Sequence, residues 1–206
     1  MRGRNSGCGT GSLEALEQRR LLAGTVTVTL DPTTQQLNIV GDNKSNQVVI
    51  GLDVNNLAVQ GTNGTTIKGP TSVAFPPGGI NVDMGNGDDS VSFDPAISGG
   101  TISAGLPLTV NTGNGDDTVL IRHFVFIQMN ISTGNGNDHV ELDLGGAGFT
   151  SGTTNIDTGN GDDSIAIDGL LQGSVTLNGG HGSDALSGIA FINTGTPTII
   201  DVETIS

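Results

Sequence analysis

Small apolar residues alternate with polar residues along most of the chain, in short runs that glycine, asparagine and proline interrupt. A period of two residues is typical of a half-buried β-strand, and these runs do not keep the 3.6-residue period of a helix. The pattern therefore predicts an all-β protein. In the first part of the chain, the alternating runs are Thr25–Leu30, Leu37–Ile39, Val48–Ile50, Asn56–Val59, Ser72–Phe75 and Ile80–Val82.

In the second part of the chain, alternating runs flank a glycine-rich turn that recurs. Its copies read VDMGNGDDSVSF, VNTGNGDDTVLI, ISTGNGNDHVEL and IDTGNGDDSIAI, followed by a looser copy, LNGGHGSDALSG. The glycines at positions 85, 113, 134, 159 and 180 are equivalent, so successive copies are 28, 21, 25 and 21 residues apart. Spacings of about 20 to 50 residues indicate a solenoid or an array of repeats.

One 21-residue repeat corresponds to about 70 Å of extended chain, which fits one circuit of a narrow coil better than a hairpin. We therefore expect a right-handed parallel β-helix or β-roll-like solenoid of about five to seven coils, with all the turns on one edge. Residues 25–79 would form a β-rich N-terminal section, and residues 80–206 the repeat solenoid. A β-sandwich is the alternative fold, because it also has many short strands and regularly spaced turns.

Stacked turns would bring acidic residues into line. Two unit charges about 5 Å apart repel by roughly 0.8 kcal/mol in water and about 3 kcal/mol at an effective dielectric constant of 20. A Ca²⁺ ion between the turns would convert this cost into binding energy, because it accepts six to eight oxygen ligands in irregular geometry. Tight structural turns with solvated aspartates are the metal-free alternative. The candidate carboxylate and amide ligands are Asp88, Asp89, Asp116, Asp117, Asn137, Asp138, Asp162, Asp163 and Asp184.

Glycine lets the turn bend so that its main-chain carbonyl groups can face an ion. The candidate glycines of this site are Gly85, Gly87, Gly113, Gly115, Gly134, Gly136, Gly159, Gly161, Gly180 and Gly182.

The turns resemble the GGxGxDxUx nonapeptide of RTX-type calcium-binding β-rolls. In one copy, Gly113 and Gly115 fill the second and fourth places, Asp117 the sixth and Val119 the apolar eighth. The resemblance implies that the sixth-place aspartate and nearby carbonyl groups bind Ca²⁺ between stacked turns, and that the ion drives folding. The chain departs from the family in two ways, since its repeats come singly and most copies lack the first glycine. The residues that replace this glycine are Met84, Thr112, Thr133 and Thr158.

A still weaker copy of the turn lies at residues 41–48. There, Lys44 and Asn46 stand in the turn, and we expect them to spoil a metal site.

The charge of the chain limits its partners. The formal net charge is −14 at pH 7, and from Gly24 onward only three Lys and Arg oppose 19 Asp and Glu. An acidic surface repels nucleic acid and anionic membranes, so small cations are the natural partners. No run approaches the roughly 18 apolar residues of a membrane span. Cys8 is the single cysteine, which excludes an intramolecular disulfide.

The N-terminal 24 residues differ from the rest of the chain. SLEALEQRRLLAG consists of helix-forming residues from Ser12 to Ala23, with Gly24 as a stop. The segment LEQRRLL from Leu16 to Leu22 resembles the LEPR-XLL segment at the start of many bacterial surface and secreted proteins, with Gln18 in place of proline. The resemblance implies that residues 1–24 are an export-associated leader, and that the protein is secreted or lies at a bacterial cell surface.

Together, these features predict a secreted or cell-surface structural or adhesive repeat protein that binds calcium and is not an enzyme. Extracellular polysaccharide or the surface matrix is a further expected partner, as is end-to-end self-association through unprotected solenoid ends. The enzymatic alternative is a β-helix polysaccharide lyase or epimerase that uses Arg122 and His123, the one basic pair after residue 24. A metal-independent solenoid and a fragment of a larger surface protein also fit the sequence.

Overall fold

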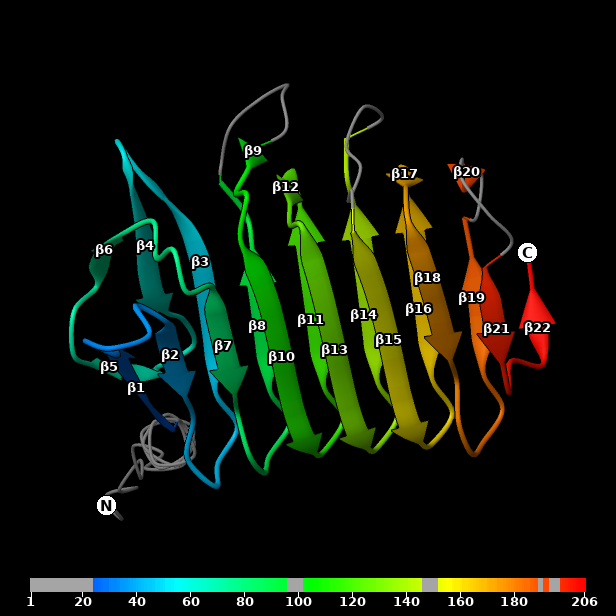
Figure 1. Ribbon diagram of the computed structural model, residues 1–206. Helices are drawn as coiled ribbons and strands as arrows, with labels where there is room; N and C mark the ends of the chain where they lie inside the picture. The colour runs from blue at the N-terminus through cyan, green and yellow to red at the C-terminus, as the bar shows by residue number, and fades with distance from the viewer. Residues whose placement is uncertain (1–23, 96–101, 146–151, 189–190, 193–196) are drawn as a thin grey trace, which may run out of the picture.

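The computed structural model describes residues 24–95, 102–145, 152–188, 191–192 and 197–206 (Figure 1). Within these residues, every regular element is a β-strand, which confirms the predicted all-β class. Residues 1–23, and with them Cys8 and nearly all of the expected leader, lie outside the described residues.

Two nine-stranded sheets make up most of the structure. In spatial order, the first sheet contains β5 (Thr66–Lys68), β1 (Thr25–Leu30), β2 (Leu37–Val40), β7 (Ile80–Asp83), β10 (Pro107–Asn114), β13 (Gln128–Asn135), β15 (Thr153–Asn160), β18 (Ser174–Asn178) and β21 (Thr198–Ile200). The second contains β6 (Ser72–Ala74), β4 (Asn56–Gly61), β3 (Gln47–Asp53), β8 (Ser90–Phe93), β11 (Thr118–Arg122), β14 (His139–Asp143), β16 (Ser164–Asp168), β19 (Ala185–Ser187) and β22 (Thr204–Ile205). Two smaller sheets pair β9 (Ile102–Ser103) with β12 (Phe124–Val125) and β17 (Leu170–Leu171) with β20 (Phe191–Ile192).

The repeats stack in parallel and in register. From β2 to β21 in the first sheet, and from β3 to β22 in the second, each strand pairs in parallel with the strand of the next repeat. Equivalent residues face each other, as Val110 lies opposite Val82 on one side and opposite Ile131 on the other. These pairings confirm a parallel β-solenoid and exclude the β-sandwich, whose sheets are antiparallel.

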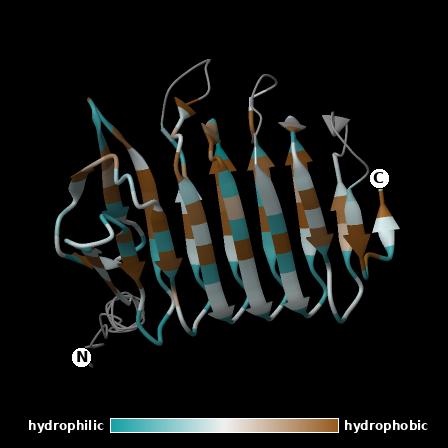
Figure 2. Ribbon diagram, in the orientation of Figure 1, coloured by the Kyte–Doolittle hydropathy of each residue, from teal (hydrophilic) through white to brown (hydrophobic). Residues whose placement is uncertain are grey.

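The core lies between the two sheets and is made mainly of aliphatic side chains. Along central strands such as β10 and β13, every second side chain is buried through most of the strand. Figure 2 shows hydrophobic and hydrophilic residues alternating along the strands. Three buried phenylalanines pack together away from the turns, with ring centroids 5.4 to 6.0 Å apart between Phe93, Phe124 and Phe126. A thin layer of Val, Ile and Leu therefore fills this interior with few aromatic residues.

The N-terminal section covers one end of the solenoid with antiparallel strands. β1 pairs antiparallel with β2, and β4 pairs antiparallel with both β3 and β6. β2 and β3 at the same time stack in parallel on β7 and β8, so the turn between them, residues 41–46, continues the row of repeat turns. No helix in the described residues is long and apolar enough to cross a membrane.

Candidate metal centre

The glycine-rich turns all lie on one edge of the solenoid, which is the lower edge in Figure 1. All ten predicted glycines have positive φ angles, a conformation that other residues rarely adopt. At Gly115, φ is +129°, and an added β-carbon would lie 2.2 Å from the carbonyl oxygen of Gly87. The turns therefore need glycine both for its backbone conformation and for close stacking.

Inside these turns, five aspartates form a column, which we call the inner column. It consists of Asp89, Asp117, Asp138, Asp163 and Asp184, each 1 to 3 % exposed. The Oδ1 atom of each aspartate accepts a hydrogen bond from the backbone N–H at the same position in the preceding turn. For example, the N–H of Asp89 donates to Asp117 at 2.7 Å, and that of Asp117 donates to Asp138 at 2.8 Å. The inner column thus ties adjacent repeats together.

Two residues at the ends extend this column, and the sequence-based set of ligands missed both. The N–H of Asn46 donates to Asp89 Oδ1 at 2.6 Å, and the N–H of Asp184 donates to Glu203 Oε2 at 2.6 Å. Asn46 carried a sequence signal, because it follows Gly41 by five residues, as Asp89 follows Met84. Glu203 carried none, since no glycine-rich turn precedes it.

The second carboxylate oxygen of each inner aspartate is unsatisfied. In all five residues, Oδ2 is buried and has no hydrogen-bond partner among the described residues. A buried ionised carboxylate is costly unless a counter-charge or a proton compensates it. The inner column therefore requires either protons or cations.

Threonine fills the place where the RTX pattern has its first glycine. Thr112, Thr133 and Thr158 are fully buried beside the inner column. Their hydroxyls donate to main-chain carbonyls one repeat further on, at 3.3, 3.1 and 2.9 Å. A hydroxyl has a single proton, so it can serve either this carbonyl or the neighbouring carboxylate. Threonine thus adds a further buried oxygen to each of these turns without satisfying the aspartate.

Burial raises the pKa of the inner aspartates because it disfavours the charged form. The pKa of Asp89 rises from 3.8 to about 8 and that of Asp117 to about 6, and the pKa values of Asp138 and Asp163 are also raised. The nearby Thr112 hydroxyl lowers the pKa of Asp117 and so offsets part of this rise. At Asp89, repulsion by the neighbouring Asp117 and Asp88 adds to the effect of burial and raises the pKa further.

The other predicted side-chain ligands form an outer column that is exposed to solvent, made of Asp88, Asp116, Asn137 and Asp162. Each accepts a backbone N–H from the next turn, as when Asn137 N–H donates to Asp116 Oδ1 at 2.8 Å. A ladder of side-chain amide hydrogen bonds runs nearby on the same turns through Asn43, Asn86, Asn114, Asn135 and Asn160. The predicted side-chain ligands therefore fall into two sets. The buried set has unpaired oxygens, and the exposed set forms hydrogen bonds between adjacent turns.

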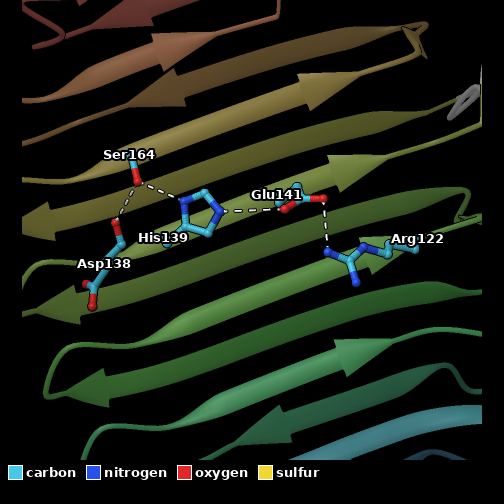
Figure 3. A network of polar contacts seen from close by, with 5 residues as sticks. All are labelled: Arg122, Asp138, His139, Glu141 and Ser164. Carbon is cyan, nitrogen blue, oxygen red and sulfur yellow. Dashed lines mark hydrogen bonds and ion pairs between the residues drawn. The ribbon is translucent and has the colours of Figure 1, made fainter.

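No three His, Cys, Asp or Glu side chains of the described residues come together as a group that could hold a metal ion. Arg122, from the expected basic pair, lies on β11 outside the glycine-rich turns. Arg122 forms an ion pair with Glu141 at 3.2 Å, and His139 Nε2 lies 3.7 Å from the same carboxylate (Figure 3). His139 Nδ1 and Ser164 Oγ are hydrogen-bonded at 2.8 Å. This network spans β11, β14 and β16 on the second sheet.

No protein-family model, no curated protein and no solved structure matches the chain.

Proposed function

We propose that the protein is a structural solenoid that binds Ca²⁺ between its stacked turns and is stabilised by it outside the cell. The observation that carries this proposal is the inner column, whose five buried Oδ2 atoms have no partner in the described residues. Divalent cations between adjacent turns would neutralise the carboxylates, and the Oδ2 atoms would coordinate these cations. The buried side-chain donors are carboxylate and hydroxyl oxygens, which suit a hard cation.

The arrangement fits weak calcium sites. Each gap between two turns offers two aspartates, so the remaining ligands would be threonine hydroxyls, carbonyl groups and water. Ca²⁺ tolerates such irregular sets, whereas Mg²⁺ demands near-octahedral geometry. Sites with few carboxylates in extracellular modules bind Ca²⁺ at about 10⁻⁴ to 10⁻³ M, so they fill outside the cell and stay empty in the cytosol. The LEPR-XLL-like segment and the charge of −14 support a secreted or cell-surface location.

Thermal unfolding of the full chain tests the proposal. Circular dichroism would be followed in EDTA and at about 1 mM Ca²⁺, with Mg²⁺ at the same concentration as the ion control. We expect Ca²⁺ to raise the melting temperature by several degrees, because it binds only the folded state. Equal melting temperatures in EDTA and Ca²⁺ would show a metal-independent solenoid instead.

Two neighbouring aspartates of one turn provide matched variants. Asp117→Asn removes a charge from the inner column, and Asp116→Asn removes the same charge from the outer column. We expect Asp117→Asn to lose most of the Ca²⁺-dependent rise in melting temperature and Asp116→Asn to keep it. In EDTA at neutral pH, Asp117→Asn should be at least as stable as the unaltered protein, since it removes an uncompensated buried charge. Equal losses in both variants would indicate screening of the overall charge and would contradict a site inside the turns.

A further inference from the structure

The turn at residues 41–46 differs from the others in sequence but occupies the same place in the solenoid. Its flanking strands stack in parallel on β7 and β8, and Asn46 is fully buried at the head of the inner column. Lys44, which we expected to spoil a metal site here, is exposed to solvent. The side chain of Lys44 therefore does not lie within the buried column.

The amide of Asn46, which we also expected to spoil a site, is fixed with its oxygen unpaired. Asn46 Nδ2 donates to the carbonyl of Lys44 at 2.6 Å and lies 3.3 Å from both the carbonyl and Oδ1 of Asp42. These acceptors require the nitrogen on that side, which leaves Oδ1 buried and without a hydrogen-bond partner among the described residues. Asn46 therefore presents an unpaired oxygen, as the aspartates do in the following turns.

Asp42 brings a carboxylate to the same place. Its Oδ2 accepts the N–H of Thr25 at 3.0 Å. Its Oδ1 and the Oδ1 of Asn46 both approach Gly24, at 2.4 and 2.1 Å from the point where a β-carbon of that residue would lie. Glycine at position 24 is what allows these two oxygens to converge, since any side chain would collide with both.

Asp89 completes the group from the next turn. Its Oδ1 holds the Asn46 N–H at 2.6 Å, and its buried Oδ2 has no hydrogen-bond partner among the described residues. Asp89 has no threonine beside it, because Met84 stands where Thr112 stands in the following turn. Asn46 thus contacts a carboxylate of its own turn, Asp42, and a carboxylate of the next turn, Asp89.

We propose that Asp42, Asn46 and Asp89 form a separate divalent-cation site, specific to the first turn and occupied by Ca²⁺. The inference rests on the proposed function and extends it to a turn that lacks the GNGDD motif. The formal charge of the three ligands is −2, which one Ca²⁺ neutralises, and all three donors are oxygens of the kind that Ca²⁺ prefers. The carboxylate of Asp42 has no equivalent in the next turn, because Gly85 stands at the matching position.

Calorimetric titration of the full chain with Ca²⁺ alone tests this site. Asp42→Asn removes one carboxylate but keeps an oxygen for the Thr25 N–H, and we expect it to lose one bound ion or to weaken one site by about tenfold or more. Asn46→Asp adds a carboxylate in place of the amide oxygen, and we expect it to strengthen one site by a similar factor. Asp53→Asn is the control, since it removes the same charge from an exposed position in the N-terminal section.

The outcomes separate the two proposals. If the unaltered protein binds no Ca²⁺, the proposed function fails and this site fails with it. If the unaltered protein binds Ca²⁺ but both Asp42→Asn and Asn46→Asp leave the number and affinity of ions unchanged, only the first-turn site is overturned. Equal weakening by Asp42→Asn and Asp53→Asn also overturns it, because general charge would then be the cause. Circular dichroism of each variant checks that the fold is retained.

Discussion

At the scale of single residues, adjacent aspartates of one turn have opposite surroundings. Asp117 is 1 % exposed with an unpaired oxygen, and Asp116 is exposed with its carboxylate at the surface. The alternation of a strand explains this difference, because Asp117 lies two residues before the buried Val119 and therefore faces the interior. The same rule places the other aspartates of the inner column inside.

The raised pKa of Asp89 predicts an unusual dependence of stability on pH in the absence of metal. The folded state holds a proton on Asp89 up to about pH 8, whereas the unfolded chain releases it near 3.8. The folded state therefore binds more protons in this window, and stability should be highest below about pH 4 and fall as the pH rises toward 8. In EDTA, we expect the melting temperature to drop by several degrees across this range.

An Asp89→Asn variant tests whether Asp89 causes the fall in stability in the upper part of this pH range. Since the pKa of Asp117 is raised only to about 6, the fall in stability between about pH 6 and 8 belongs mainly to Asp89. We expect Asp89→Asn to remove that part of the fall, and Asp88→Asn, which alters an exposed neighbour, to retain it. A melting temperature that stays constant or rises from pH 4 to 8 in EDTA would contradict a buried, uncompensated Asp89.

At the scale of elements, the strand–turn–strand repeat depends on glycines that allow close stacking. Replacing Gly115 with alanine would force a side chain into φ +129° and bring its β-carbon to 2.2 Å from Gly87 O. We expect a loss of about 3 kcal/mol in the free energy of unfolding, from backbone strain together with overpacking. Denaturant unfolding at a fixed Ca²⁺ concentration measures this loss.

Gly105→Ala is the matched control for that substitution. Gly105 has φ +63°, and an added β-carbon would meet no atom within 4 Å. This variant should cost about 1 kcal/mol, since only the left-handed backbone conformation is unfavourable. Similar losses at the two positions would show that close stacking of the turns does not limit the stability of the repeat.

The strands and turns of the repeats could be predicted because the repeated turn sequences align with one another. The recurrence of glycines and aspartates at equivalent positions indicated one turn in each coil. The alternation of apolar and polar residues indicated the strands between the turns. The orientation of Asn46 was not readable, because it depends on the carbonyl of Lys44 and on Asp42, whose positions only the folded turn fixes. Glu203 was not readable either, since it reaches the column from a shorter turn without glycine. The packing of Thr112 against Asp117 likewise required the stacked structure.

At the scale of the whole molecule, the solenoid is a linear stack in which each repeat contacts mainly its neighbours. Its two ends are unequal. The N-terminal end carries antiparallel strands, with six residue pairs joining β3 and β4. At the other edge of the sheets, β21 and β22 pair over three and two residues, and Ile205 is 58 % exposed. In a linear stack, stability follows from the interfaces between neighbours, so unequal interfaces give unequal local stability.

This inequality predicts a gradient of amide hydrogen exchange along the stack. The central pair β10 and β13 matches over seven residue pairs and has strands on both sides, so its amides should exchange only in large-scale unfolding. Amides of β21 and β22 should exchange at least about 100-fold faster, because separating these edge strands breaks few contacts. Mass spectrometry of peptides from residues 107–135 and 198–205 measures both rates. Equal protection would mean that the stack unfolds as one cooperative unit, with the inner column coupling its ends more strongly than the strand pairing does.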